Sequence, residues 1–435
     1  MAPRRVNRVL VVGLDGAPAL LFDRWLDELP ALRGLTERGT YGVLRSCDPP
    51  ITVPAWASMT SSRSPGALGL YGFRNRRDRS YDGAVLADSR AVRVPRVWDV
   101  LSQRGREVIV VGVPQTYPVT PVNGVMVSCF QAPGAVRTHP SELEGEIENL
   151  VGEYITDVPA FRTDDKERVR RDIEEMTEKR FRVAEHLLTT RPWDFFFMVE
   201  IGTDRMQHAF WRSQDMVLDY YRSVDEKLGR LLQLLDDDTA VLVVSDHGAK
   251  RMDGCFHVNE WLKRKGYLML LAEPSEPTPL TPDLVDWART TAWSDGGYYA
   301  RVYLNVAGRE PAGSVTSCEY DAVRDELASK LDDVGEARRP EDLYDQVNGV
   351  APDLLAYFGD LHWRCSALVG TNSLHSSEND TGPDEANHDH EGIYVIAADG
   401  ICAGCGPERD IRDIAPTILS LLGEPIPFAR AIGGA

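Results

Sequence analysis

Short, continuously apolar runs alternate with amphipathic stretches along the chain. Residues 8–14 (RVLVVGL), 195–200 (FFFMVE) and 240–245 (AVLVVS) are apolar and rich in β-branched or aromatic side chains, which predicts strands buried on both faces. Residues 20–39 and 217–235 instead follow helical spacing, the first with a break at Pro30. This alternation of strands and helices predicts an α/β fold around a mostly parallel central sheet.

Two long segments interrupt the alternation. Residues 135–190 are polar with many charges at i,i+4 spacing, which predicts a helical excursion from the sheet. Residues 249–385 are less regular and lead into the polar, aperiodic run 375–392, the kind of loop that is usually functional or disordered. We expect one domain, 1–435, in which 135–190 is a helical insertion and 249–385 an insertion that shapes the substrate pocket.

Composition and charge narrow the class of protein. The chain is 43% hydrophobic, enough for a large core, and its formal net charge of -19 argues against a nucleic-acid polymer or an anionic membrane as partner. The apolar run near the N-terminus is short and ends in Asp15-Gly16, so we expect neither a signal peptide nor a membrane span. Seven scattered cysteines predict a reducing, cytoplasmic setting.

Candidate metal ligands follow three of the predicted strands. Asp15 follows the first strand, Asp204 the second, and Asp246-His247 the third. Each alone is also explained as a turn residue. The carboxyl ends of strands in an open α/β sheet meet at one edge, however, so the three together predict a shared site. If 203–211 is helical, His208 lies one turn from Asp204 and can bind the same ion.

Thr52 precedes Pro54, which suits the first turn of a helix. A hydroxyl just before a helix N-terminus faces free N–H groups and the positive end of the helix dipole, a ready site for a phosphate. The plainer alternative is a threonine that only caps the helix.

Seven motifs, spread in order over nearly the whole chain, resemble those of the alkaline phosphatase superfamily, and most closely its type I phosphodiesterase/nucleotide pyrophosphatase-like branch. They are VVGLDG, PPITVPAWASMTS, TDRMQHAFW, VVSDHG, NEWLKRKGYL, NHDHEGIYV and DIAPTILSLLG. The resemblance implies an alkaline-phosphatase-like three-layer sandwich with helical and irregular insertions. It also implies two divalent metal ions, with Zn²⁺ favoured over Mn²⁺.

The resemblance further implies a role for each candidate. Thr52 is the nucleophile that forms a phospho-threonine, and its oxygen joins Asp15, Asp246 and His247 around one metal. Asp204, His208 and His388 hold the other metal, with His390 and His257 as spare candidates. Because Thr52 stands where sulfatases of the superfamily need Cys or Ser, a sulfatase is disfavoured.

The expected activity is hydrolysis of a small phosphate ester, with monoester and diester both open. The alternatives are a metal-dependent phosphomutase and a non-catalytic binding protein of the same fold. In nucleotide pyrophosphatases an asparagine beyond the nucleophile donates to the phosphate, but an ungapped count here lands on Gly72-Phe73, with Asn75 just beyond. We expect Trp56 and Phe73 to stack on the substrate and Arg74 and Asn75 to contact its phosphate.

Overall fold

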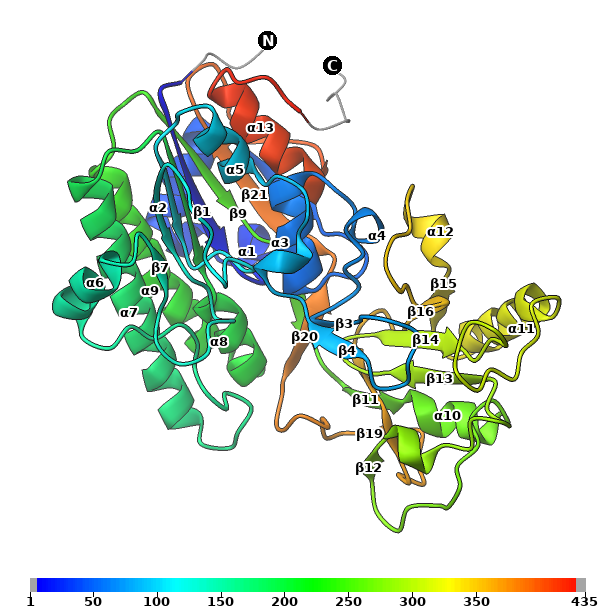
Figure 1. The fold of residues 1–435 in the computed structure, drawn as a ribbon. Helices are drawn as coiled ribbons and strands as arrows, with labels where there is room; N and C mark the ends of the chain where they lie inside the picture. Colours follow the sequence, from blue (N-terminus) through cyan, green and yellow to red (C-terminus); the bar gives the residue numbers. More distant parts are fainter. Residues whose placement is uncertain (1–5, 428–435) are drawn as a thin grey trace.

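The computed structural model describes residues 6–427, and its centre is a large sheet between two layers of helices (Figure 1). The strand order is β22-β2-β21-β9-β1-β8-β5-β6-β7, with β23 paired to β2. The consecutive strands β9, β1, β8, β5 and β6 are parallel, whereas β21 and β7 run antiparallel to their neighbours. The bounds are β1 Arg8–Leu14, β2 Thr40–Arg45, β5 Val108–Val111, β6 Gly124–Val127, β7 Thr138–His139, β8 Phe195–Glu200, β9 Thr239–Val244, β21 Glu391–Ala397, β22 Gly404–Cys405 and β23 Arg409–Asp410.

Both faces of the sheet are covered because successive side chains of a strand point to opposite sides. Leu10 and Val12 of β1 pack under the helices of one layer, and Val9 and Val11 under those of the other. The first layer contains α1 Leu20–Arg24, α2 Pro30–Arg38, α6 Leu143–Val151, α7 Lys166–Thr190, α8 Gly202–Phe210 and α9 Gln214–Gln233. The second contains α3 Thr52–Ser61, α5 Val97–Gln103 and α13 Ile414–Leu421. The α/β fold and its three layers are therefore confirmed.

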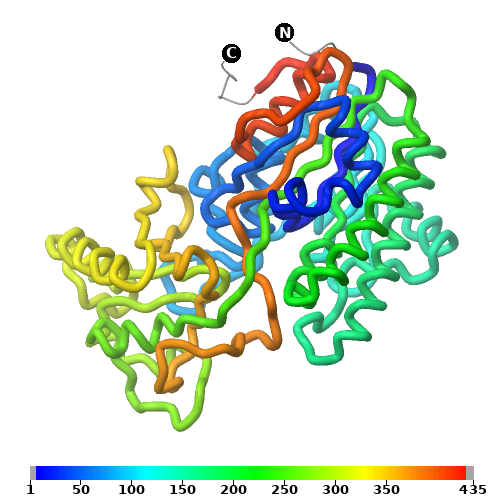
Figure 2. Tube along the Cα trace, turned by 180° about the vertical axis from the view of Figure 1, so that it is seen from behind, coloured from blue at the N-terminus to red at the C-terminus, as the bar shows by residue number. Residues whose placement is uncertain are grey.

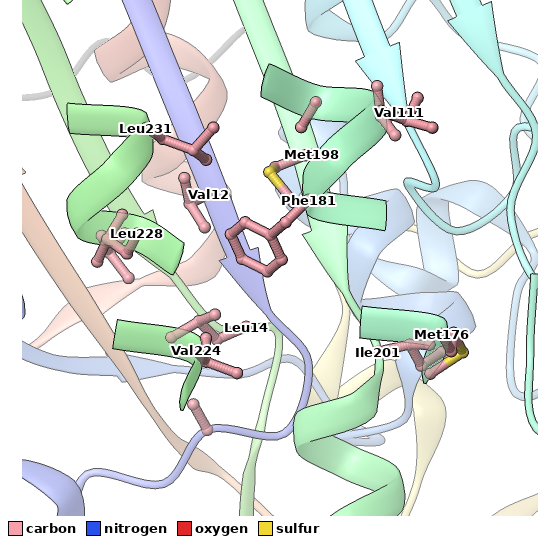
Figure 3. Close-up of a cluster of buried hydrophobic side chains, with 14 of the residues drawn as sticks. Val12, Leu14, Val111, Met176, Phe181, Met198, Ile201, Val224, Leu228 and Leu231 are labelled. Carbon is pink, nitrogen blue, oxygen red and sulfur yellow. The ribbon is translucent and has the colours of Figure 1, made fainter. Parts of the chain in front are cut away.

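The charged segment 135–190 is helical, but α7 does not project away from the sheet. Its apolar face, including Phe181, Ala184 and Leu187, is fully buried against the strands. Figure 3 shows Phe181 between Val12 and Met198. The i,i+4 charge pairs thus occupy only the outer face of a helix that belongs to the first layer. Whether 135–190 and 249–385 are best regarded as insertions in one domain stays a prediction.

Residues 249–385 build a smaller lobe beside the sandwich, with its own hydrophobic core (Figure 2). Its elements are β11 Gly254–His257, α10 Val258–Arg264, β12 Thr278–Pro279, β13 Ala292–Asp295, β14 Ala300–Leu304, α11 Tyr320–Asp332, β15 Glu336–Arg338, α12 Pro340–Leu343, β16 Leu354–Tyr357, β17 Trp363–Ser366, β18 Leu368–Val369 and β19 His375–Ser376. The chain leaves the sandwich through β10 Gly248–Arg251 and returns through β20 Ala386–Asp389, which pair with each other. Strand β10 directly follows His247 and strand β20 contains His388, so both connections to the smaller lobe lie at the predicted site.

The basic cluster after Thr52 forms a hairpin, β3 Arg74–Arg76 and β4 Ala84–Leu86, that docks on the smaller lobe. Tyr81 at its tip stacks on Trp287 with ring centroids 3.5 Å apart. Arg76 is buried, and its guanidinium lies 3.7 Å from Glu310. The positive charge of Arg76 therefore helps to hold the hairpin against the smaller lobe.

Membrane-spanning helices and disulfide bonds are two further features on which the sequence carries an expectation. Within residues 6–427, no helix combines the length and the hydropathy needed to cross a membrane. All seven cysteines lie in this range and none forms a disulfide.

Candidate active site

Seven polar side chains predicted from the sequence come together where the sandwich meets the smaller lobe. Strands β1, β8 and β9 are adjacent and parallel, so the residues that follow them meet at one edge of the sheet. Helix α3 and strand β20 bring the remaining two residues to the same place. All seven are at most 3% exposed: Asp15, Thr52, Asp204, His208, Asp246, His247 and His388.

The first half of the cluster is centred on His247. Its Nε2 lies 3.6 Å from Asp15 Oδ1, 3.3 Å from Asp246 Oδ2 and 3.4 Å from Thr52 Oγ1. The two carboxylate oxygens are buried and have no hydrogen-bond partner. Buried oxygens without a partner are costly in a folded protein, so these two are suited to bind a cation.

The second half contains Asp204, His208 and His388. Asp204 Oδ1 lies 3.3 Å from His208 Nε2 and 3.5 Å from His388 Nε2, and the two nitrogens are 3.4 Å apart. His247 also approaches this half, because one ligand atom each from Asp204, His247 and His388 lie within 4.8 Å of one another. The two halves therefore form one continuous cluster of acidic and imidazole ligands.

Each carboxylate has one oxygen fixed by the protein and the other turned into the cluster. Trp56 Nε1 donates to Asp15 Oδ2 at 2.8 Å, and the Gly16 N–H donates to Asp246 Oδ1 at 3.1 Å. Arg205 Nη1 donates to Asp204 Oδ2. Gly16 has φ +69, and a Cβ there would lie 3.3 Å from an Asp204 oxygen, so glycine suits the turn under the site.

Each of the three imidazoles likewise has one ring nitrogen fixed by the protein and the other turned into the cluster. His247 Nδ1 donates to the Gly248 carbonyl at 2.8 Å, and His388 Nδ1 donates to the Pro50 carbonyl at 2.9 Å. His208 Nδ1 donates to Asp384 Oδ1 at 2.7 Å. A histidine that ligates a metal usually donates its other ring N–H in this way, so the three Nε2 atoms are prepared for ligation.

The carboxylates repel each other strongly in the absence of cations. Burial raises the pKa of Asp15 well above the usual range, and the neighbouring Asp204 raises it further. Burial likewise raises the pKa of Asp246 well above the usual range, and the neighbouring Asp15 adds to that rise. Burial also opposes ionisation of Asp204, but His208 and Arg205 hold its pKa well below the usual range. Divalent cations would relieve this repulsion, which is what a metal site requires.

The imidazoles differ in their affinity for protons. Burial lowers the pKa of His388 to about 4, and burial together with the nearby His388 lowers the pKa of His247 well below its ordinary value. Burial opposes the charge on His208 too, yet Asp384 and Asp204 raise its pKa to about 10. Binding of a cation at His208 would therefore release a proton.

Thr52 is the first residue of α3, and Ile51 occupies the N-cap position. The Thr52 hydroxyl caps no backbone N–H but faces His247. The plain N-cap alternative is therefore wrong, and Thr52 lies one residue later than the position expected just before the helix. The first-turn N–H groups of α3 precede the intrahelical hydrogen bonds and remain available for an anion.

One of the four expected substrate contacts is wrong. Trp56 is fully buried against Phe197, so it cannot stack on a substrate and instead orients Asp15. Asn75 uses both ends of its amide within its own turn, accepting from Tyr71 N–H at 2.6 Å and donating to the Gly72 carbonyl at 2.9 Å. One of its two amide N–H groups is thus held within the turn, and a contact of the other with a phosphate stays a prediction.

Arg74 is exposed in the hairpin, where its carbonyl accepts from Arg301 Nη1, and its phosphate contact stays a prediction. Phe73 is half-buried and makes an edge contact with Phe130, their ring centroids 6.2 Å apart. Of the spare histidines, His390 bonds Asp48 instead of the cluster, at 2.8 Å. His257 is buried at the end of β11 in the smaller lobe.

Three further side chains surround the second half of the cluster, and the sequence reasoning missed them. Asp384 accepts from His208 Nδ1 and from Arg162 Nε, and Arg162 Nη2 donates to Tyr298 Oη at 3.0 Å. Tyr298 Oη also lies 3.5 Å from His208 Nε2. The aperiodic run 375–392 signalled function around Asp384, but no pattern marked Arg162 or Tyr298.

Replacing Asp384 by asparagine is expected to lower the affinity for metal about tenfold or more, since the partner that orients His208 loses its charge. Titration of the metal-free protein with zinc would measure this. Asp360→Asn is the matched control, because Asp360 is exposed and pairs only with Lys250. Equal zinc affinity of Asp384→Asn and the wild type would contradict the orienting role.

Comparisons with known proteins place this geometry in context. The family model for type I phosphodiesterase / nucleotide pyrophosphatase matches residues 9–384. Among curated proteins, none has a sequence that matches the chain significantly.

Solved structures share the fold over nearly the full length. Phosphonoacetate hydrolase from Sinorhizobium meliloti 1021, in complex with phosphonoformate, is 17% identical with a TM-score of 0.65, covering 97% of this chain and 96% of that chain. Human ectonucleotide pyrophosphatase / phosphodiesterase 5 is 14% identical with a TM-score of 0.62, covering 98% and 97%. An inactive threonine-to-alanine variant of the murine protein, in complex with AMP, is also 14% identical with a TM-score of 0.62, covering 99% and 97%.

Proposed function

We propose that this chain, which belongs to the type I phosphodiesterase / nucleotide pyrophosphatase family, cleaves a small phosphate ester through a phospho-threonine formed on Thr52. The family consists of metal-dependent phosphoric ester hydrolases, and the chain is one of them. Two divalent ions are proposed, one held by Asp15, Asp246, His247 and the Thr52 oxygen, the other by Asp204, His208 and His388. Zinc is favoured and manganese is the alternative, because carboxylate and imidazole ligands suit both.

One observation carries the proposal. Each of the six candidate ligand side chains has one polar atom fixed by the protein and another turned toward the cluster, and the hydroxyl of Thr52 lies among those free atoms. A nucleophile on a helix N-terminus, surrounded by metal ligands, suits transfer of a phosphoryl group.

The reaction takes two displacements. Bound divalent ions would supply positive charge and lower the pKa of hydroxyl groups beside them. Thr52 Oγ1 attacks phosphorus, so that an Oγ1–P bond forms while the bond to the leaving oxygen breaks and that oxygen takes a proton. The first-turn N–H groups of α3 hold the oxygens that remain on phosphorus. Water then attacks the phospho-threonine, which releases phosphate or a monoester and restores the Thr52 hydroxyl.

A screen of phosphate monoesters and diesters, with free phosphate and released alcohol both measured, tests the proposed reaction. Release of the alcohol from a diester, or of phosphate from a monoester, is expected. Transfer of the phosphoryl group within one substrate, without free phosphate, would instead indicate a phosphomutase and refute hydrolysis.

The group attached to phosphorus is proposed to be aromatic, as in a nucleotide. A groove of about 810 Å³ is lined in part by Phe130 and Phe161, and Phe73 contacts Phe130. The ring of Phe161 lies 5.8 Å from that of His208, which brings this groove to the metal ligands. Planar groups can stack on such rings, whereas small aliphatic groups gain little there.

Phe73→Ala is therefore expected to raise the KM for nucleotides and aryl phosphates severalfold, with little change for small aliphatic phosphates. Steady-state kinetics on both substrate classes measures this. Phe22→Ala is the matched control, since Phe22 is equally half-buried but packs on Tyr41 in another part of the sandwich. Equal kinetics for both classes in the wild type and in Phe73→Ala would refute the aromatic preference.

The proposed partner is this small phosphorylated substrate rather than a nucleic-acid polymer or a membrane. A cytoplasmic location is proposed, supported by seven cysteines of which none, within residues 6–427, is in a disulfide.

A further inference from the structure

We propose that Tyr298, delivered by the smaller lobe, is a substrate-binding residue whose hydroxyl donates a hydrogen bond to a phosphate oxygen at the Asp204–His208–His388 half of the site. The inference rests on the proposed function, because it requires a phosphate group between the two halves of the cluster.

The backbone holds Tyr298 firmly in position. It lies in the turn between β13 and β14, directly after Gly296 and Gly297. Gly297 exchanges two backbone hydrogen bonds with Cys365 of β17, at 2.8 and 2.9 Å. A Cβ on Gly296 would lie 2.6 Å from the Ala367 nitrogen, so glycine allows this close approach to the neighbouring strand.

The ring of Tyr298 ends a column of three stacked rings. Tyr298 stacks on His388 with centroids 3.8 Å apart, and His388 stacks on His247 at 3.7 Å. The Arg364 guanidinium lies over the tyrosine ring, 4.7 Å from its centroid. Thr52 lies at the His247 end of this column, so Tyr298 and the nucleophile mark opposite ends of the space that a phosphate would occupy.

The hydrogen bonds of the hydroxyl direct its proton toward that space. Tyr298 Oη accepts from Arg162 Nη2 at 3.0 Å, and Arg162 is itself fixed by Asp384. Within residues 6–427, the second hydrogen-bond partner of the hydroxyl is His208 Nε2, at 3.5 Å. When that nitrogen ligates a metal it no longer accepts a proton, so the Tyr298 O–H is left to a ligand bound at this half of the site.

This donor lies at the end of the site away from α3. The Asn75 amide is held within its own turn, where it accepts from the Tyr71 N–H and donates one of its two N–H groups to the Gly72 carbonyl, and Arg74 is exposed. The N–H groups of α3 serve only the Thr52 end of the site. A phosphate that spans both halves therefore accepts a hydrogen bond from Tyr298 at the end of the site that is farther from Thr52.

The test uses Thr52→Ala protein, which cannot turn over substrate, with inorganic phosphate as the probe in calorimetric titrations of the metal-loaded form. Adding Tyr298→Phe is expected to weaken phosphate binding roughly tenfold or more, as for the loss of a hydrogen bond to a charged group. Metal content and the unfolding midpoint should stay unchanged. In enzyme with Thr52 intact, Tyr298→Phe should lower kcat/KM by a similar factor.

Tyr299→Phe is the matched control. The neighbouring Tyr299 is buried and its hydroxyl donates to the Tyr71 carbonyl, away from the ligands, so phosphate affinity should not change. Equal phosphate affinity with and without Tyr298→Phe would overturn the inference and leave the proposed function standing. Loss of bound metal in Tyr298→Phe would also overturn it, since the tyrosine would then be a metal ligand. Failure of the Thr52→Ala protein itself to bind phosphate would contradict the proposed function.

Discussion

Thr52→Ala is expected to lower turnover by at least about 10³-fold while the protein stays folded and keeps its metal ions. The substitution removes the hydroxyl that lies beside His247 among the free ligand atoms and leaves the carboxylates and imidazoles in place. Because the Thr52 side chain caps no backbone group, the loss in stability should be no more than about 1 kcal/mol. Initial rates, metal content and thermal unfolding of the purified variant measure the three quantities.

Two variants sharpen this test. Thr60→Ala removes a buried hydroxyl from the same helix, where it donates to the Trp56 carbonyl at 2.7 Å, and should leave turnover unchanged. Thr52→Ser keeps a hydroxyl and should retain part of the activity. If Thr52→Ala stays within about tenfold of the wild-type rate, Thr52 is not the nucleophile.

Removal of the metal ions is expected to abolish activity, and elemental analysis of protein purified without chelator should give close to two divalent ions per chain. The ligands come together only in the folded chain, so bound ions stabilise it and the thermal midpoint should also fall on chelation. Zinc or manganese added back should restore both activity and midpoint.

Asp246→Asn should reduce the metal content to about one per chain, because it affects the half of the cluster around His247. His390→Gln should leave the content unchanged, since His390 bonds Asp48 and lies outside the cluster. A content below one transition metal in the wild type, with no activation by zinc or manganese, would refute the two-metal site.

The ligands could be predicted because they follow buried strands. The pattern of residues 8–14 alone predicts β1, and the same reasoning applies to β8 and β9, whose parallel pairing brings Asp15, Asp204 and Asp246 to one edge. His208 followed from helical spacing. The choice of His388 over His390 required the family resemblance, since both follow a polar, aperiodic run and no apolar pattern marks the short strand β20.

The remaining parts of the site depend on packing between distant segments. Arg162, Tyr298 and Asp384 come from three separate loops, which meet where the smaller lobe docks on the sandwich. Trp56 was predicted to stack on a substrate because it lies four residues after the nucleophile. That spacing also lets its indole reach Asp15 from within the core, and periodicity alone cannot distinguish the two uses of the ring.

The charged helix α7 shows the same limit. Its i,i+4 ion pairs, such as Arg170 with Glu174, dominate the sequence pattern, although one face of the helix is apolar. The structure buries that face on the sheet because the adjacent strands leave an apolar face to cover. The charged residues thus predicted the solvent-facing side of α7, but they did not indicate that its other side is buried against the sheet.

Thr52 is proposed to carry the phosphoryl group covalently during turnover, and this step can be detected directly. Acid quenching of the enzyme during turnover, followed by proteolysis and mass spectrometry, should find a phosphoryl group on the peptide between Arg45 and Arg63, localised to Thr52. Thr52→Ala should carry no such group. A phosphoryl group on another residue, or none in quenched samples that are turning over substrate rapidly, would contradict the proposed mechanism.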